Sequence, residues 1–207
     1  MVKFLRETGY VISKKVEEAM LAVDRAAFTP AGVPPYEDRP YHIAKGQTIS
    51  APGVVAFMLE QLELEPGMKV LEIGTGSGYN TALLSYLVGE KGRVVSFEVV
   101  PEVCGIAKKN LAKLGPPENT EVHCADGSAG YEKKAPYDRI IVTAAMPYLD
   151  DSHPLVRQLT DDGKIVAPVG GRFFQDVIVY DKRTRSSRKV LPVIFVPMVG
   201  KQGFDGV

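Results

Sequence analysis

A glycine-rich turn between a short apolar run and a helix-length segment constrains the fold of this chain more than any other feature. In "KVLEIGTGSGY", Lys69–Tyr79, the run "KVLEI" predicts a buried strand, and the segment after the glycines predicts a helix. The same order repeats further along: strands are predicted at 93–98, 120–124, 137–144 and 163–170, and helices at 79–89, 101–115 and 153–159. Such alternation predicts a doubly wound parallel sheet, because right-handed crossovers place helices on both of its faces.

The last part of the chain has a different pattern. Two β-rich runs flank a polar turn between 173 and 200, which predicts an antiparallel hairpin at the sheet edge and seven strands in all. The turn "KRTRSSRK", Lys182–Lys189, holds five cations in eight residues. A solvated hairpin tip is favoured over a nucleic-acid contact, because strands flank the turn and the whole chain has no net charge.

The glycines after the first of these strands indicate where the sheet binds a ligand. Gly74, Gly76 and Gly78 let the backbone approach a ligand closely, and the helix that follows presents free amide groups. Their spacing differs from the GxGxxG of dinucleotide-binding turns, since Tyr79 stands where the last glycine is expected. The Gly-Lys-Ser/Thr of a P-loop is also absent from the turn, so NAD and nucleoside triphosphates are both disfavoured.

Acidic residues stand at the ends of three successive predicted strands: Glu72, Glu98 and Asp126. Glu98, 20 residues beyond Gly78, is placed to accept hydrogen bonds from both ribose hydroxyls of an adenosine, and Asp126 to accept one from the adenine amino group. Taken singly, each carboxylate can equally be a solvated strand end or a helix cap. Together they favour an adenosine without a pyrophosphate, and S-adenosylmethionine fits, because its sulfonium and amino group are cationic.

Two amphipathic helices are predicted upstream of this core, at 13–28 with Ser13 as its cap and at 52–64, separated by an irregular proline-rich segment. The stretch "KGQTISAP", Lys45–Pro52, lies directly before the second helix. Its Thr48 and Ser50 can cap this helix or can hydrogen-bond a ligand. The local sequence leaves both roles open.

Composition excludes several classes of protein. Lys plus Arg and Asp plus Glu number 25 each, so no global basic field favours a polyanion as partner. No apolar run is long enough to cross a bilayer, and the N-terminus lacks the apolar core of a signal peptide, so a cytoplasmic location is expected. The two cysteines, Cys104 and Cys124, are too few for a disulfide framework and are interpreted as small buried side chains without chemistry.

The stretches "GQTISAP", "MKVLEIGTGSGY", "APYDRIIVTAA", "IVAPVG" and "FVPMVGKQG" resemble one known family, the protein L-isoaspartate (D-aspartate) O-methyltransferases. Many Rossmann-like S-adenosylmethionine methyltransferases share the glycine turn, whereas "GQTISAP" followed by that turn and by "YDRI" is specific to this family. The resemblance runs from about Val16 to Gly203. It implies a seven-stranded sheet with an antiparallel last hairpin, and N-terminal and C-terminal segments that help to enclose a peptide.

The resemblance also implies roles for particular residues. Ser50 matches the active-site serine of the family, and the peptide slot is expected to be shaped by Gln47, Thr48, Ile49, Ser50 and Ala144. The implied cofactor-binding residues are Glu72, Ile73, Gly74, Thr75, Gly76, Gly78, Glu98, Asp126, Gly127 and Thr143. The implied cofactor is S-adenosyl-L-methionine, which leaves as S-adenosyl-L-homocysteine, and no metal is required.

The implied reaction transfers a methyl group to the free carboxylate of L-isoaspartyl and D-aspartyl residues in damaged proteins, and repair then proceeds through a succinimide. Two alternatives stay open: a carboxyl methyltransferase of the same fold that acts on another peptide or metabolite, and a non-catalytic protein that binds S-adenosylmethionine. We expect one domain, 1–207, with a helical, substrate-side portion at 1–64, a cofactor-binding core at 65–170, and a C-terminal hairpin and substrate-side tail at 171–207. Damaged proteins are the expected partners of a monomer that binds neither nucleic acid nor membrane.

Overall fold

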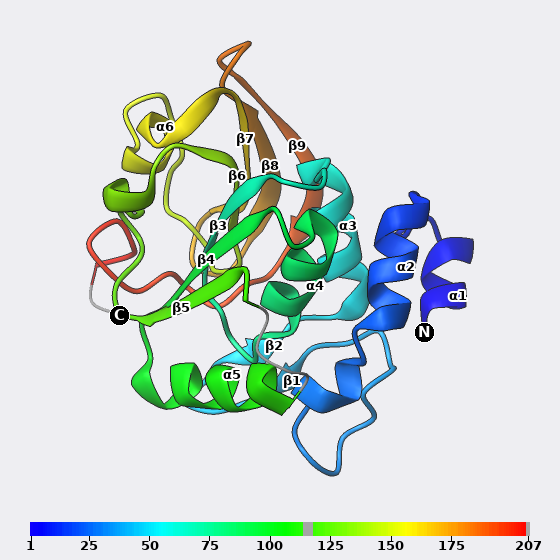
Figure 1. The fold of residues 1–207 in the computed structure, drawn as a ribbon. Coiled ribbons are helices and arrows are strands. Elements are labelled where there is room, and N and C mark those ends of the chain that lie inside the picture. The colour runs from blue at the N-terminus through cyan, green and yellow to red at the C-terminus, as the bar shows by residue number, and fades with distance from the viewer. Residues whose placement is uncertain (114–117, 206–207) are drawn as a thin grey trace.

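The computed structural model describes residues 1–113 and 118–205, and its centre is a seven-stranded mixed sheet (Figure 1). The strand order is β5-β4-β3-β6-β7-β8-β9, and β8 pairs antiparallel with both of its neighbours, which confirms the predicted fold. The strands are β3 (Lys69–Ile73), β4 (Arg93–Glu98), β5 (Thr120–Cys124), β6 (Tyr137–Val142), β7 (Leu159–Gly170), β8 (Gln175–Asp181) and β9 (Ser186–Val193).

Parallel pairing aligns the carboxyl ends of the central strands. Ile73 of β3 pairs with Phe97 of β4 and with Val142 of β6, so these three strands end at one level. At the next position, Glu98 pairs with Cys124 of β5. The loops that follow the strands, including the glycine turn, therefore gather at one edge of the sheet, where open α/β sheets bind their ligands.

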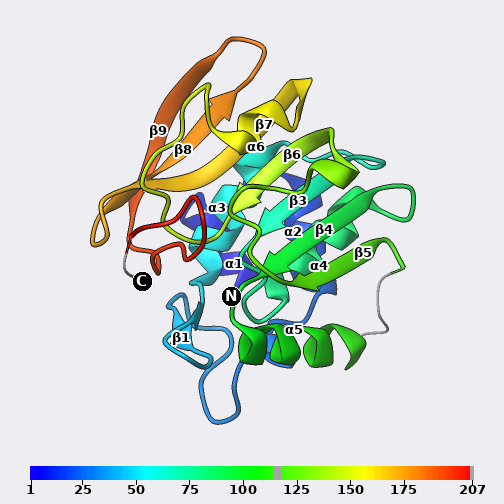
Figure 2. The same ribbon diagram turned by 90° about the vertical axis from the view of Figure 1, so that its left-hand side faces the viewer.

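Helices cover the two faces of the sheet unequally (Figures 1 and 2). They are α1 (Val2–Glu7), α2 (Lys14–Ala22), α3 (Pro52–Leu62), α4 (Tyr79–Val88), α5 (Pro101–Lys113) and α6 (Pro154–Arg157), with the 3-10 helices η1 (Arg25–Phe28) and η2 (Glu132–Lys134). One apolar cluster joins α1, α2, α3 and α4 to one face, and a second joins α6 to the other. None of the helices in the described residues has the length and apolar character needed to cross a bilayer.

The helix predicted at 13–28 is in fact two elements. Ser13 caps α2 as predicted, since its side chain accepts a hydrogen bond from the Val16 amide. Val23 then takes an extended conformation, and Asp24 starts η1 by accepting a hydrogen bond from the Ala26 amide at 3.0 Å. The apolar period continues through this break, which is why the sequence pattern alone does not reveal it.

Other short elements also differ from their predictions. Helix α1 and the strands β1 (Tyr41–His42) and β2 (Thr48–Ile49) are too short to show a hydrophobic period and were not predicted. Helix α6 ends before the predicted 159, because β7 already begins there. The predicted end of α5 at Gly115 lies outside the described residues.

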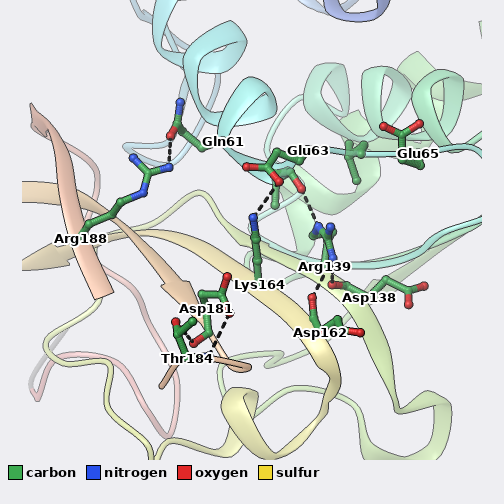
Figure 3. Close-up of polar contacts among 12 residues, drawn as sticks. Gln61, Glu63, Glu65, Asp138, Arg139, Asp162, Lys164, Asp181, Thr184 and Arg188 are labelled. Atoms are coloured by element: carbon green, nitrogen blue, oxygen red, sulfur yellow. Dashed lines mark hydrogen bonds and ion pairs between the residues drawn. The ribbon is translucent and has the colours of Figure 1, made fainter. Parts of the chain in front are cut away.

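The basic run Lys182–Lys189 lies in the β8–β9 hairpin, but only its first half forms the predicted tip, because Ser186–Lys189 already pair with β8 as part of β9. Arg188 donates a hydrogen bond to the side chain of Gln61 on α3 at 2.7 Å, as Figure 3 shows, and Lys182 donates one to the backbone of Leu159 at 2.6 Å. These contacts fasten the hairpin to α3 and β7.

The interpretation of the two cysteines as side chains without chemistry is wrong, because Cys104 and Cys124 form a disulfide. Helix α5 packs on β5 and brings their Cα atoms to 5.6 Å, within the range for disulfides. Cys104 is buried as expected, whereas Cys124 is exposed. The proximity arises from the packing of two elements, so the spacing in the sequence gives no sign of it.

Candidate active site

An open cavity lies at the carboxyl edge of the sheet, and the space between its lining residues is about 1000 Å³ when the open mouth is included. The predicted site residues that line it are Gln47, Thr48, Ile49, Ser50, Ile73, Gly74, Thr75, Gly76, Glu98, Gly127, Thr143 and Ala144. In Figure 2, β1 and the C-terminal tail lie on the side of the sheet toward which β3 and β4 point. Three segments that are distant in sequence therefore surround one space.

The glycine turn forms one wall of this cavity. Gly74 has a φ of 99°, which favours glycine, and a Cβ atom there would clash with the hydroxyl oxygen of Thr143. Gly78 has a φ of 90°, and helix α5 packs against it through Ala107 and Leu111. The two glycines have different tasks: Gly74 allows the turn to pass beside Thr143, whereas Gly78 lies outside the cavity and lets α5 approach.

Glu98 is 5% exposed and lies against the backbone of the glycine turn. Its Oε2 accepts a hydrogen bond from the Gly76 amide at 2.9 Å, and its Oε1 accepts one from the Val100 amide at 3.0 Å. An ionised carboxylate can accept about four hydrogen bonds, so lone pairs remain for hydroxyl groups in the cavity. Glu98 therefore has the position and the chemistry to bind a pair of ribose hydroxyls.

Glu72 does not line the cavity. Its side chain is fully buried and accepts hydrogen bonds from Asn80 at 2.8 Å, Thr81 at 2.5 Å and Ser96 at 2.6 Å. Burial raises the pKa of Glu72 to about 7, although the hydrogen bonds from these three side chains lower it. In this structure Glu72 braces β3 against α4 and β4 behind the glycine turn, and its predicted contact with the cofactor stays a prediction.

The C-terminal tail forms a further wall; the family resemblance implies a C-terminal segment that helps to enclose the peptide, but no residue of the tail was among the predicted site residues. The Ala145 amide donates to the Val196 carbonyl at 2.8 Å, and the Met198 amide donates to the Ala145 carbonyl at 2.9 Å. Residues 195–199 line the cavity as a result. They lie in "FVPMVGKQG", one of the stretches that carries the family resemblance, so that stretch was the available signal.

Asp126 holds this tail in place and does not line the cavity, although Gly127 beside it does. Its carboxylate accepts hydrogen bonds from the backbone amides of Ser128 at 2.8 Å and Lys201 at 2.9 Å. Partial burial raises the pKa of Asp126, but these hydrogen bonds outweigh burial and keep the pKa below its ordinary value. Its present contacts are those of a structural anchor, and the predicted adenine contact stays a prediction.

Ser50 lies on the wall that the N-terminal portion supplies. Helix α3 has Ala51 at its N-cap position and no side-chain cap, so neither Ser50 nor Thr48 takes the capping role. The Ser50 carbonyl accepts a hydrogen bond from Arg25 at 2.8 Å, while no partner for the Ser50 hydroxyl lies within residues 1–113 and 118–205. The hydroxyl is therefore available to a ligand.

A family model described as protein-L-isoaspartate(D-aspartate) O-methyltransferase matches residues 1–203 of the chain. The chain belongs to this family. The protein-L-isoaspartate O-methyltransferase of Hyperthermus butylicus is 45% identical, over 99% of this chain and 89% of its own length. A solved structure from Plasmodium falciparum, described as a protein-L-isoaspartate O-methyltransferase in complex with S-adenosyl-L-homocysteine, is 26% identical with a TM-score of 0.85, and the match covers 94% of both chains. A further solved protein-L-isoaspartate O-methyltransferase is 32% identical with the same TM-score, and covers 98% of this chain and 66% of its own.

Membership of this family fixes the reaction class of the chain. The chain is an S-adenosylmethionine-dependent methyltransferase that acts on isoaspartyl residues of proteins, so the predicted family, cofactor and enzyme class are confirmed. Within the described part of the chain, no cluster of three or more His, Cys, Asp or Glu side chains could hold a metal ion.

Proposed function

We propose that the family's two reactants meet in this cavity, with S-adenosylmethionine along the glycine turn and the isoaspartyl carboxylate at Ser50. One observation carries the proposal: the glycine turn and Ser50, which are distant in sequence, line the same cavity. Glu98 would bind the ribose hydroxyls, and Gly127 would lie beside the adenine. Gln47, Thr48, Ile49 and Ala144 would shape the slot for the peptide.

The cavity residues fit this pair of reactants. S-adenosylmethionine supplies a methyl group bonded to a positively charged sulfur. The accepting carboxylate is already ionised near neutral pH, because the ordinary pKa of such a group is near 4, so the chain needs no strong general base. What the chain must supply is orientation and exclusion of water. The Ser50 hydroxyl can orient the carboxylate, and the apolar side chains of Val54, Met58 and Phe195 limit water in the cavity.

Transfer of a labelled methyl group to an isoaspartyl peptide, with the matching normal aspartyl peptide as control, tests the proposal. We expect label only in the isoaspartyl peptide, as a base-labile ester, and slow return of part of the product to normal aspartate through a succinimide. Equal labelling of both peptides would instead favour a carboxyl methyltransferase with another substrate. Tight binding of S-adenosyl-L-homocysteine without any transfer would favour a non-catalytic binding protein.

The same assay with a D-aspartyl peptide extends the proposal to that substrate. We further propose that the chain acts as a monomer in the cytoplasm and as one domain, with its substrate-side portion at 1–64, its cofactor-binding core at 65–170, and its hairpin and substrate-side tail at 171–207. Sedimentation of the protein at the concentration of the assay, with and without peptide, tests whether it is a monomer. The Cys104–Cys124 disulfide favours a cytoplasmic location only if the protein comes from a hyperthermophile, because disulfides are uncommon in the cytosol of other organisms.

A further inference from the structure

A charged side chain lies buried behind the wall that holds Ser50. Arg25, the first residue of η1, is 1% exposed. No ion pair in the described residues involves it. Removing a guanidinium from water costs several kcal/mol unless other interactions offset it, and an apolar side chain of similar volume is often at least as stable. Stability alone therefore gives no reason for an arginine here.

The contacts of Arg25 join three segments around the cavity. Its Nη2 donates to the Ser50 carbonyl at 2.8 Å, and its Nε donates to the Pro35 carbonyl at 2.9 Å. Its guanidinium lies over the ring of Tyr79, with the central carbon 5.1 Å from the ring centroid. Tyr79 is the first residue of α4, directly after Gly78. One side chain therefore links the loop that carries Ser50 to the helix that follows the glycine turn.

The charge on Arg25 persists at neutral pH. Burial lowers the pKa of Arg25 to about 10, while the neighbouring Tyr79, Asp38 and Tyr41 raise it. At pH 7 the group is therefore protonated and keeps all of its donors. The Nη1 atom of Arg25 and the hydroxyl of Tyr79 are nonetheless buried without a hydrogen-bond partner in the described residues. Arg25 therefore makes its hydrogen bond to the Ser50 carbonyl in a position where two neighbouring polar atoms stay unpaired.

The segment that carries Ser50 needs such support. It follows β2, which pairs only with β1 through two residues, and an isolated hairpin of this size is marginally stable. It precedes α3, which begins without a side-chain cap. The long-range side-chain contacts that hold its backbone are Arg25 to Ser50 and Asp38 to the Gly53 amide at 2.7 Å. The direction of the Ser50 side chain follows the orientation of this backbone.

We propose that Arg25 is a positioning residue for methyl transfer: it fixes the Ser50 backbone relative to α4 and the glycine turn, and so aims the Ser50 hydroxyl at the substrate carboxylate. The inference rests on the proposed role of Ser50. Arg25 does not line the cavity and so acts through Ser50 rather than on the reactants. A misplacement of about 1 Å in a reacting geometry can lower the rate about 100-fold.

The test compares Arg25→Lys with Arg139→Lys. Arg139 (Figure 3) is a matched control, because it is also buried and also donates to backbone carbonyls, those of Leu62, Asp138 and Asp162. Unlike the loop that Arg25 holds, none of these residues lines the cavity. We expect Arg25→Lys to lower kcat with an isoaspartyl peptide about 10- to 100-fold and to leave the Kd for S-adenosyl-L-homocysteine within about threefold. Arg139→Lys should lower stability and leave kcat unchanged.

A double-mutant cycle with Ser50→Ala separates positioning from general weakening. If Arg25 acts through Ser50, the double variant loses no more kcat than Ser50→Ala alone. Additive losses, full activity of Arg25→Lys, or an equal loss in Arg139→Lys would overturn the inference. Because Arg25→Lys keeps a charge to bury, Arg25→Gln is the second variant if the first does not fold. A wild-type enzyme without any transfer activity would refute the proposed function instead, before any variant is compared.

Discussion

The two sides of the cavity are built in different ways. In the proposed function the cofactor side consists of backbone at the ends of hydrogen-bonded strands, where the amides of Gly74 and Thr75 both donate to the Phe97 carbonyl, at 2.8 and 3.1 Å. The substrate side is a loop between a pair of two-residue strands and α3, held by the side chains of Arg25 and Asp38. The first side gains its shape from the sheet, and the second from a few side-chain hydrogen bonds between residues distant in sequence.

This difference suits the two reactants. S-adenosylmethionine has one structure, so a wall of fixed backbone can match it. Isoaspartyl sites occur in proteins of many sequences, and a wall made of a short loop can accept different neighbours while Ser50 stays anchored. Changes on the cofactor side should therefore alter binding of the cofactor, and changes on the substrate side should alter turnover. The predictions below test that division.

Gly74→Ala should have the largest effect. A Cβ atom at this position meets the Thr143 hydroxyl, and the φ of 99° is strained for alanine. We expect the Kd for S-adenosyl-L-homocysteine, measured by calorimetry, to rise about 100-fold or more. Gly67→Ala is the matched control, because Gly67 has a φ of 90° but nothing within 4 Å of a Cβ atom. Comparable loss of affinity in both variants would show that backbone strain, and not crowding by Thr143, is responsible.

Glu72 should make the stability of the cofactor side depend on pH. The pKa of Glu72 is about 7 in the folded protein and ordinarily 4.5, so between these values the folded chain binds more protons than the unfolded chain. The free energy of unfolding should therefore fall as pH rises through this window, by about 3 kcal/mol in total at 1.36 kcal/mol per pH unit.

Denaturant unfolding at pH 4.5, 6 and 8 measures this decrease in the free energy of unfolding, and the Glu72→Gln variant should lose most of the decrease. Glu90→Gln, at an exposed position on the loop after α4, serves as the control and should keep the fall. The charge of Arg25, whose pKa is about 10, does not change across this range, so the substrate side should be insensitive to it. Parallel curves for wild type and Glu72→Gln would rule out this role of Glu72.

The disulfide should stabilise the cofactor side without a part in catalysis. Cys104 and Cys124, 20 residues apart, tie α5 to β5, which leads into Gly127. Closing a loop of this length is worth about 3 kcal/mol. We expect Cys104→Ser with Cys124→Ser to lower the free energy of unfolding by that amount and to leave kcat at 25 °C within about twofold. Treatment of the wild type with reductant should lower the free energy of unfolding by the same amount. Equal stability with and without reductant would show that the disulfide does not stabilise the fold.

Most of the fold could be predicted from the sequence because its signals are local. The glycine turn, the apolar runs and the helix periods between them mark each strand of the sheet, and "KVLEI" and "RVVSFE" coincide with β3 and β4. The strands β1 and β2 escaped prediction because two residues carry no period. The cysteine pairing escaped because it depends on how α5 lies on β5.

The candidate site was predictable in part for a related reason. Residues next to the strand ends, such as Gly74 and Glu98, follow from the topology of an open sheet. Asp126 and Glu72 stand at similar positions in the sequence, yet their carboxylates have partners within the protein, which no pattern of residue types reveals. Arg25 is the clearest case: in the sequence it is an ordinary cation in an amphipathic helix, and only its contacts connect it to Ser50.

Ser50→Ala should have the smallest of these effects, and it is the most direct test of the division between the two sides. Loss of one hydrogen bond to a charged group costs about 1.5 to 3 kcal/mol, which would lower kcat roughly 10- to 100-fold. The Kd for S-adenosyl-L-homocysteine should not change, because Ser50 belongs to the substrate wall. Ser13→Ala is the matched hydroxyl deletion, since Ser13 caps α2 outside the cavity, and should lower stability by about 1 kcal/mol with kcat unchanged. If Ser50→Ala weakens cofactor binding as much as it lowers kcat, the two walls do not divide the reactants, and the cavity must be treated as a single binding surface.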